Sequence, residues 1–259
     1  MTQAAKNSPV KQKRAVFAQK STYKRTEIMA RTNDKLVQGR NRAKMRHSKS
    51  AGAVPALDDF DKQKLGLIGP ILVSRAGYKL LYAMRVFQYD FREKFVLDIG
   101  SSTGGFTEVA LRNGAKTVLA VEIGTNQMHP TLAHHPAVIL REKTDFCVLK
   151  NTENYQVDTI LADISFMSLT KIIKCAIING WVGANTDFLV MFKPQFEVSP
   201  SFLINGVLKN SAMRRQAIKK FETWLKTNHI LIKAKQDNVL AGKNGNVERF
   251  YWLKYIKII

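Results

Sequence analysis

The chain of 259 residues has no apolar run that approaches the roughly 20 residues needed to span a bilayer. Its first 30 residues carry charges throughout and lack the apolar stretch of a secretion signal. We therefore expect no membrane segment and a cytoplasmic protein.

Cysteine and histidine are scarce. The two cysteines, Cys147 and Cys175, give neither a disulfide framework nor a metal-ligand spacing, so we expect both to be reduced. The five histidines fall into no ligand pattern. The sequence predicts no metal site.

Acidic residues are few beside basic ones: 20 Asp and Glu face 41 Lys and Arg, a net charge of +21. Residues 1–50 alone carry fourteen basic and two acidic residues, or +12 of that total. This excess favours a polyanionic partner, with nucleic acid ahead of an anionic membrane surface. We interpret residues 1–60 as a basic, largely non-globular arm and linker that binds RNA; the alternative is a merely solubilising tail.

The second predicted domain, residues 61–259, alternates apolar strands with helical segments. This alternation predicts the α/β class, with a Rossmann-like, mostly parallel sheet and helices between its strands. A helix capped by Ser74 is expected before the first strand, and another near residues 211–227. The last two strands are close in sequence and should pair as an antiparallel hairpin. Strands are expected at residues 95–99, 117–123, 137–140, 159–163, 187–193, 230–235 and 247–256.

A glycine-rich turn, GSSTGG at residues 100–105, follows the strand at 95–99, and Glu122 closes the next strand. Such a turn lets backbone amides approach a ligand, while a carboxylate at the second strand end can accept both ribose hydroxyls. Ser102 replaces the middle glycine of the dinucleotide motif, and Phe106 follows Gly105 where a phosphate loop needs lysine. NAD and ATP are therefore disfavoured and S-adenosylmethionine is favoured, with an ordinary strand-to-helix turn as the alternative.

The residues expected to bind the cofactor lie in this turn and at neighbouring strand ends. We expect Asp98 to hold the glycine loop or the methionine amine. Asp145, after the third strand, is a weaker candidate for the adenine amine, because a loop aspartate faces solvent about as often. The full set is Asp98, Gly100, Ser101, Gly104, Gly105, Phe106, Glu122 and Asp145.

Two further polar residues stand where apolar strands finish, at Asp163 and Lys193. Ligands of open α/β sheets bind beyond the carboxyl ends of the strands. If the two strands are neighbours, a carboxylate and an ammonium face each other there, and the lysine can serve as a base. Taken singly, each has another explanation: Asp163 as a helix N-cap, and Lys193 as a side chain that extends into water.

Five segments carry a resemblance to a known family: SRAGYKL from residue 74, VLDIGSSTGGFTE from 96, DISFMSL from 163, FKPQFEV from 192 and GNVERFYWL from 245. They resemble the TlyA family of FtsJ-like ribosomal RNA 2′-O-methyltransferases, sometimes labelled haemolysins. The likeness covers about residues 72–254 in the same order. The family often carries an N-terminal S4 RNA-binding domain, for which residues 1–70 show no pattern.

The resemblance implies that Lys79, Asp163, Lys193 and Glu248 form a catalytic tetrad for S-adenosylmethionine-dependent methylation of a ribose 2′-hydroxyl. In this family the acceptor is cytidine in ribosomal RNA, so ribosomal RNA or ribosomal subunits are the expected partners. We expect Lys193 to be the base, Lys79 and Glu248 to orient Lys193 and the acceptor ribose, and Asp163 to anchor the network. The alternatives are a non-catalytic RNA-binding protein on a methyltransferase scaffold and a membrane-active haemolysin.

Overall fold

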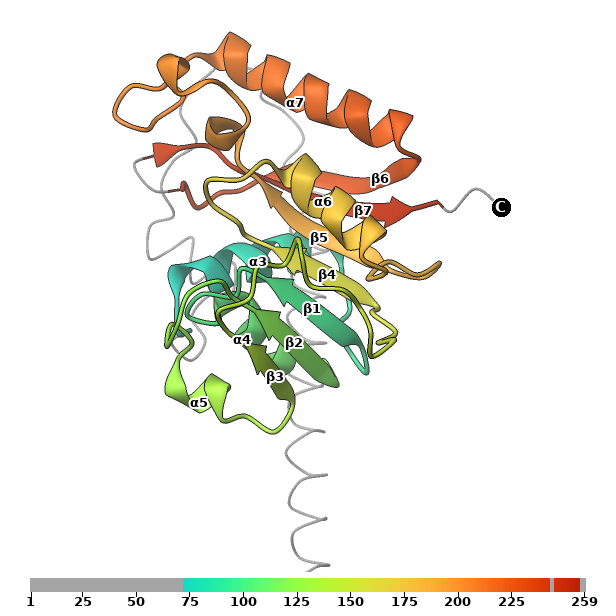
Figure 1. Ribbon diagram of the computed structural model, residues 1–259. Coiled ribbons are helices and arrows are strands. Elements are labelled where there is room, and N and C mark those ends of the chain that lie inside the picture. Colours follow the sequence, from blue (N-terminus) through green and yellow to red (C-terminus); the bar gives the residue numbers. More distant parts are fainter. Residues whose placement is uncertain (1–71, 243–244, 257–259) are drawn as a thin grey trace, which may run out of the picture. The chain divides into compact units, whose positions relative to one another are not determined.

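The computed structural model describes residues 72–242 and 245–256, so the predicted arm at residues 1–60 lies outside the described part. A seven-stranded sheet has the order β3-β2-β1-β4-β5-β7-β6 (Figure 1). Every predicted strand is present, with ends within two residues of those expected. The strands are β1 (Phe95–Ile99), β2 (Thr117–Val121), β3 (Val138–Arg141), β4 (Thr159–Ala162), β5 (Asp187–Phe192), β6 (Ile230–Asp237) and β7 (Arg249–Tyr255).

The helices and short turns fill the connections. The predicted helix at residues 211–227 is α7. The helical elements are α3 (Arg75–Phe87), α4 (Gly105–Arg112), α5 (Pro130–Ala133), α6 (Leu169–Ile178) and α7 (Ser211–Thr227), with 3-10 turns η1 (Pro194–Phe196) and η2 (Pro200–Phe202).

Strands β1 to β5 pair in parallel, and their apolar residues suit strands that are buried on both faces. Leu97 of β1 lies in register with Leu119 on one side and Ile160 on the other. All residues of β4 are buried, as expected for a strand covered on both faces. The predicted mostly parallel sheet is therefore confirmed.

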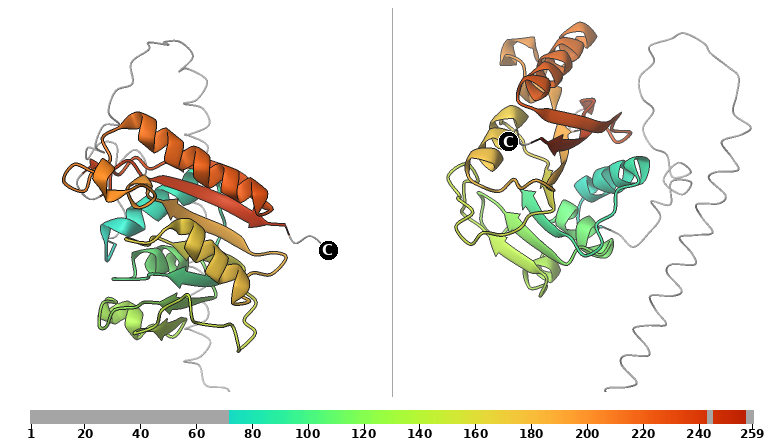
Figure 2. Two further views of the ribbon diagram at one scale, coloured as in Figure 1. Left: turned by 45° about the horizontal axis from the view of Figure 1, so that its top comes forward. Right: turned by 90° about the vertical axis from the view of Figure 1, so that its right-hand side faces the viewer.

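Helices cover both faces of this sheet, as the right-hand view of Figure 2 shows. On one face, α3 and α4 pack on a core that includes Val96, Leu161 and Met191. On the other, α6 and α7 pack on a larger core that includes Ile160 and Tyr251. Successive side chains along one strand therefore enter opposite layers, so the position of a residue in its strand determines which face of the sheet its side chain joins.

The last two strands form the predicted hairpin, because β6 and β7 pair antiparallel. Strand β7 also pairs antiparallel with β5, with Phe192 opposite Arg249. This pairing sets the start of β7 beside the end of β5. The chain after β5 and the chain before β7 thus meet at one edge of the sheet.

Helix α3 begins as expected directly after Ser74, which occupies the N-cap position, but the hydroxyl makes no capping hydrogen bond. Its Oγ is buried without a hydrogen-bond partner among the described residues. A Cβ at Gly105 would overlap this oxygen and the amide of Gly77. The hydroxyl is thus turned toward α4, where two glycines let the helices approach closely.

Two expectations for the segment before β4 are wrong. No helix lies between β3 and β4; residues 142–158 cross the α6 face of the sheet in turns and irregular structure. The cysteines are not reduced: Cys147 in this segment and Cys175 in α6 form a disulfide with an S–S distance of 2.11 Å. The sequence contains only these two cysteines, and their proximity depends on the crossing segment, which periodicity does not predict.

Candidate functional site

Three of the four candidate catalytic residues lie at the same edge of the sheet, next to strand ends. Asp163 follows β4, Lys193 follows β5 and Glu248 precedes β7. These three strands are adjacent, and Phe192 is opposite Arg249. Side-chain alternation continues from Leu161, Met191 and Phe250, all in the core layer beneath α3, so the three polar groups point to the α3 face.

The fourth residue, Lys79, reaches this edge from α3. Its Nζ lies 2.6 Å from Glu248 Oε2, and both side chains are at least nine-tenths buried. The same nitrogen donates a weak hydrogen bond to Met191 Sδ at 3.9 Å. The positive charge of Lys79 and the negative charge of Glu248 thus balance each other, and a buried charge needs such a partner.

Lys193 forms the second ion pair. Its Nζ lies 2.7 Å from Asp163 Oδ1, with side-chain exposures of 10% and 15%. The same ammonium donates to Ser165 Oγ at 3.1 Å and to the main-chain oxygen of Asp163 at 3.4 Å. The ring of Phe196 lies 5.9 Å from it. The structure thus assembles a buried and a largely buried ion pair at this edge of the sheet, with a formal charge of zero.

The glycine turn occupies the same edge, after β1. Gly100 and Gly104 have φ values of +74° and +89°, which residues with a Cβ rarely adopt. A Cβ at Gly104 would overlap Leu132, and one at Gly100 would press on Ile164 at 3.2 Å. Ser101 Oγ is buried, with no hydrogen-bond partner among the described residues. The two glycines are therefore required by their backbone conformation and by close packing against Leu132 and Ile164, and the turn leaves one hydroxyl unpaired.

Glu122 stands at the end of β2, where the sequence predicts a ribose carboxylate. It is 8% exposed and accepts hydrogen bonds from the amides of Ser102 at 2.9 Å and Gly124 at 2.8 Å. Each carboxylate oxygen keeps a further lone pair. The next side chain, Ile123, is 70% exposed and offers an apolar surface beside the carboxylate.

Asp98 lies beneath the turn and is 1% exposed. Its Oδ2 accepts a hydrogen bond from Thr107 Oγ1 at 2.7 Å. Burial raises the pKa of Asp98 to about 7, and the charges of Asp163 and Glu122 act in the same direction. A carboxyl that titrates near neutrality at this position can become charged when a cationic group binds above it.

The other predicted cofactor residues are placed differently. Gly105 packs against α3, and the Phe106 side chain is 3% exposed and stacks on Phe250 with centroids 5.9 Å apart. The Phe106 ring is therefore part of the core, and its backbone belongs to the first turn of α4. Asp145 is exposed, and its Oδ1 accepts from the amide of Cys147 at 2.8 Å.

Sequence reasoning missed three residues of the site. Ser165 and Gln195 contact the ion pairs, and Gln195 Nε2 donates to Glu248 Oε1 at 3.1 Å. Phe166 is 90% exposed at a φ of +65°, and its ring lies 5.0 Å from that of Phe196. All three lie within DISFMSL or FKPQFEV, so these segments were a signal, but nothing in the sequence shows which way each side chain points.

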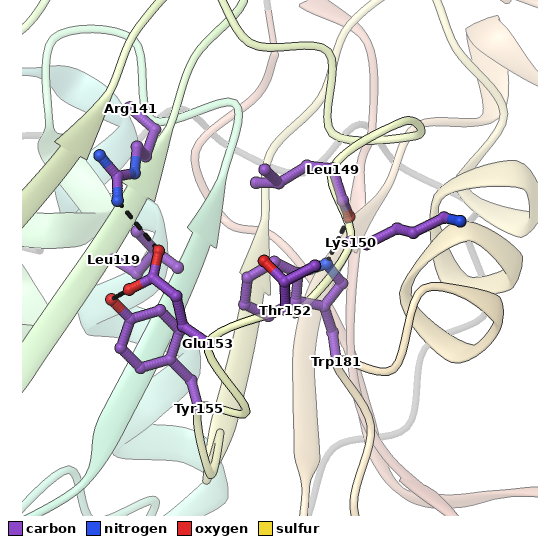
Figure 3. Close-up of a pocket in the computed structure, with 8 residues that line it drawn as sticks. All are labelled: Leu119, Arg141, Leu149, Lys150, Thr152, Glu153, Tyr155 and Trp181. Atoms are coloured by element: carbon purple, nitrogen blue, oxygen red, sulfur yellow. Dashed lines mark hydrogen bonds and ion pairs between the residues drawn. The ribbon is translucent and has the colours of Figure 1, made fainter.

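A pocket elsewhere contains none of these residues (Figure 3). In it Arg141 pairs with Glu153 at 3.1 Å, and Trp181 Nε1 donates to the main-chain oxygen of Leu149 at 2.8 Å. These contacts tie the crossing segment 142–158 to the sheet and to the end of α6. Arg141, Glu153, Tyr155 and Trp181 all take part in contacts within this pocket, which is consistent with a structural role.

The observed donor set fits a nucleoside cofactor that has no phosphate. The glycine turn, the unpaired hydroxyl of Ser101 and the carboxylate of Glu122 lie at the carboxyl ends of β1 and β2, next to the switch point between β1 and β4. The strand order and this site define the class: a Rossmann-like methyltransferase.

Comparisons with known proteins give the family. The model of the FtsJ-like methyltransferase family matches residues 72–255. A 23S rRNA (cytidine-2′-O)-methyltransferase TlyA of Campylobacter jejuni is 37% identical over 199 residues, covering 76% of each chain. A 16S/23S rRNA (cytidine-2′-O)-methyltransferase TlyA of Mycobacterium tuberculosis is 34% identical over 187 residues, covering 70% of this chain and 68% of its own. A solved structure from Lactococcus lactis, described as a candidate hemolysin, matches with a TM-score of 0.68 and 31% identity, covering 73% of this chain and 90% of its own.

The chain belongs to the FtsJ-like methyltransferase family, within the group that carries the name TlyA or haemolysin A. Its cofactor is S-adenosylmethionine. Within residues 72–242 and 245–256, no helix is long and apolar enough to cross a membrane. The same residues contain no group of three or more acidic, histidine or cysteine side chains placed to hold a metal.

Proposed function

We propose that this protein methylates the 2′-hydroxyl of a ribose, in a cytidine of ribosomal RNA, with Lys193 as the base. The observation that carries the proposal is the two ion pairs at the sheet edge that holds the glycine turn: the buried pair Lys79–Glu248 and the largely buried pair Lys193–Asp163. The TlyA relatives, which are rRNA (cytidine-2′-O)-methyltransferases, support ribosomal RNA as the substrate and the 2′-oxygen of a cytidine as the acceptor.

The chemistry asks the protein for alignment and for removal of a proton. S-adenosylmethionine supplies an electrophilic methyl group that needs only a correctly placed nucleophile. A ribose hydroxyl is a very weak acid, so a base must accept its proton as the oxygen–carbon bond forms. Lys193 lies at a strand end held by Asp163 and Ser165, which fixes Nζ in one place. To act as the base, Lys193 must first release one proton of its ammonium to solvent. The amine can then accept the hydroxyl proton, which restores the ammonium paired with Asp163.

The other ion pair orients the acceptor in this proposal. Lys79 donates to Glu248 and has further hydrogens directed by its ammonium geometry, while Glu248 is 3% exposed and held in place. A ribose hydroxyl can donate to the carboxylate or accept from the ammonium. Positioning of this kind converts a slow encounter into an aligned reaction, which contributes more to rate than binding alone.

An aromatic surface beside the tetrad suits a nucleobase. Phe166 is 90% exposed, and its ring packs against the ring of Phe196. The Phe196 ring in turn lies 5.9 Å from Lys193 Nζ. Unpaired bases that proteins extrude from RNA stack on such rings. We assign the acceptor base to the exposed face of Phe166.

Basic faces on the described helices supply a docking surface for the RNA backbone. Helices α6 and α7 expose Lys171, Lys174, Arg215, Lys219, Lys220 and Lys226. Their sequences contain one carboxylate, Glu222, which is already paired with Lys235 at 2.9 Å. An excess of unpaired cations attracts phosphates. We propose that residues 1–60, with +12 in the first fifty, add to this attraction as an RNA-binding arm.

The test uses purified protein, labelled S-adenosylmethionine and ribosomal RNA offered free, as small subunits and as large subunits. The proposal expects label in at least one of these RNAs, loss of label in Lys193→Ala, and normal label in Lys116→Ala, an exposed lysine before β2. Transfer by Lys193→Ala at the wild-type rate contradicts the assignment of the base. A protein that binds RNA but shows no heat of binding with S-adenosylmethionine is instead a non-catalytic RNA-binding module.

A further inference from the structure

The carboxylate of Glu248 is held from three sides. Lys79 Nζ lies 2.6 Å from Oε2. Gln195 Nε2 donates to Oε1 at 3.1 Å. On the third side, a Cβ at Gly242 would overlap Oε1 and the carboxyl carbon, so the bare backbone of this glycine closes over the group. Glu248 can therefore shift little without breaking one of these contacts.

Gln195 belongs to the same short turn as the candidate base. The 3-10 turn Pro194–Phe196 starts directly after Lys193 and is closed by a hydrogen bond from the amide of Glu197 to the carbonyl of Pro194 at 3.1 Å. The carboxylate of Glu197 accepts from the first turn of α6 at 2.7 Å, which anchors the other end. Proline fixes its own φ, so the turn is stiff. Gln195 thus links Lys193 rigidly to Glu248.

The side-chain oxygen of Gln195 indicates why this residue occupies its position. The side chain is 6% exposed, and Oε1 is buried with no hydrogen-bond partner among the described residues. The amide orientation follows from chemistry, because an ionised carboxylate only accepts and Nε2 must face it. A buried carbonyl without a partner destabilises a fold. Positions where a protein accepts such a defect are commonly functional.

We propose that Gln195 is a positioning residue for methyl transfer. It fixes Glu248, and through Glu248 the ammonium of Lys79, in the orientation that the acceptor ribose requires. A neutral amide does this without charge, which keeps the two lysines balanced by two carboxylates. A glutamate here would place two carboxylates side by side, and a lysine would leave one cation unbalanced. This inference rests on the proposed function.

The first test is Gln195→Met, which keeps the length of the side chain but removes both polar atoms. We expect kcat to fall about 10- to 100-fold, the loss typical of one hydrogen bond to a charged group. The KM for S-adenosylmethionine should change less than about twofold, because the hydrogen bond that is lost goes to Glu248 and not to the glycine turn. The Tm should stay within a few degrees of wild type or rise, because an unsatisfied carbonyl is removed. Gln156→Met, an exposed side chain of the crossing segment 142–158, is the matched control and should leave kcat and KM unchanged.

The second test presses on the same carboxylate from the opposite side. Gly242→Ala should lower kcat with little effect on cofactor KM, because the new methyl group displaces Glu248. Gly183→Ala, where a Cβ meets nothing closer than 3.7 Å, is the control and should be silent.

Three outcomes overturn the inference. One is wild-type kcat in Gln195→Met, and another is a loss of activity that only follows a lower Tm. The third is a crystal structure of Gln195→Met in which Glu248 stays in place, and it applies whatever the activity. An inactive wild-type protein on every ribosomal RNA tested would instead contradict the proposed function, which separates the two failures.

Discussion

The buried carboxyl of Asp98 makes a quantitative prediction about stability and pH. Aspartate in an unfolded chain has a pKa of about 3.9. Burial raises the pKa of Asp98 in the folded protein to about 7. Between these values the folded state keeps a proton that the unfolded chain has released, so stability falls as pH rises. The three-unit difference corresponds to about 4 kcal/mol, reached near pH 7 and constant above it.

Asp98→Asn removes this titration but keeps an oxygen that accepts from Thr107. The variant should therefore be close to wild type in stability near pH 4 and more stable by an increasing amount up to pH 7, at about 1.4 kcal/mol per pH unit. Urea unfolding of both proteins across this range measures the difference, in which all other titrating groups cancel. Parallel curves for wild type and variant would refute the reasoning. The same variant should bind S-adenosylmethionine more weakly, because it cannot supply a negative charge beneath the turn.

Three further predictions concern the disulfide, the aromatic surface and the basic helix face. Reducing Cys147–Cys175, or replacing both by serine, removes a link across 28 residues and should lower the free energy of unfolding by roughly 3–4 kcal/mol, measured by urea denaturation with and without reductant; two titratable thiols in the untreated protein would contradict it. Phe166→Ala should weaken the binding of the acceptor RNA by about 10-fold and leave affinity for S-adenosylmethionine unchanged, because base stacking on an aromatic ring is worth roughly 1–3 kcal/mol; equal RNA affinity in a filter-binding assay speaks against the stacking role. Lys219→Ala with Lys220→Ala should make RNA affinity less dependent on salt, with a slope of log K against log salt lower by about 1–2, and an unchanged slope means that α7 faces away from the RNA.

Much of the fold follows from patterns that a single sequence carries. Continuous apolar runs predict the central strands, because β4 and β5 are covered on both faces. The nearness in sequence of Ile230–Asp237 and Arg249–Tyr255, with a glycine-containing loop between them, predicts their hairpin. The crossing segment 142–158 and its disulfide escape such patterns, because its order depends on distant contacts such as Trp181 with Leu149.

The residues of the site could be predicted where polar side chains stand at the ends of apolar strands. Asp163 and Lys193 stand at the ends of apolar runs, and the structure joins them at 2.7 Å. Lys79 and Glu248 were expected only through the resemblance, since 169 residues separate them and no local pattern pairs them. Gln195 was missed because its hydrogen bond to Glu248 depends on the antiparallel pairing of β5 with β7, which no local pattern in the sequence shows.

The most direct test of the account is a nucleoside mass analysis of ribosomal RNA after reaction with this protein and methyl-labelled S-adenosylmethionine. The account predicts that the label is recovered as 2′-O-methylcytidine with wild type, and that Lys193→Ala yields none while still binding the cofactor. Label recovered on a base atom, or 2′-O-methylcytidine formed at the wild-type rate by Lys193→Ala, would contradict it.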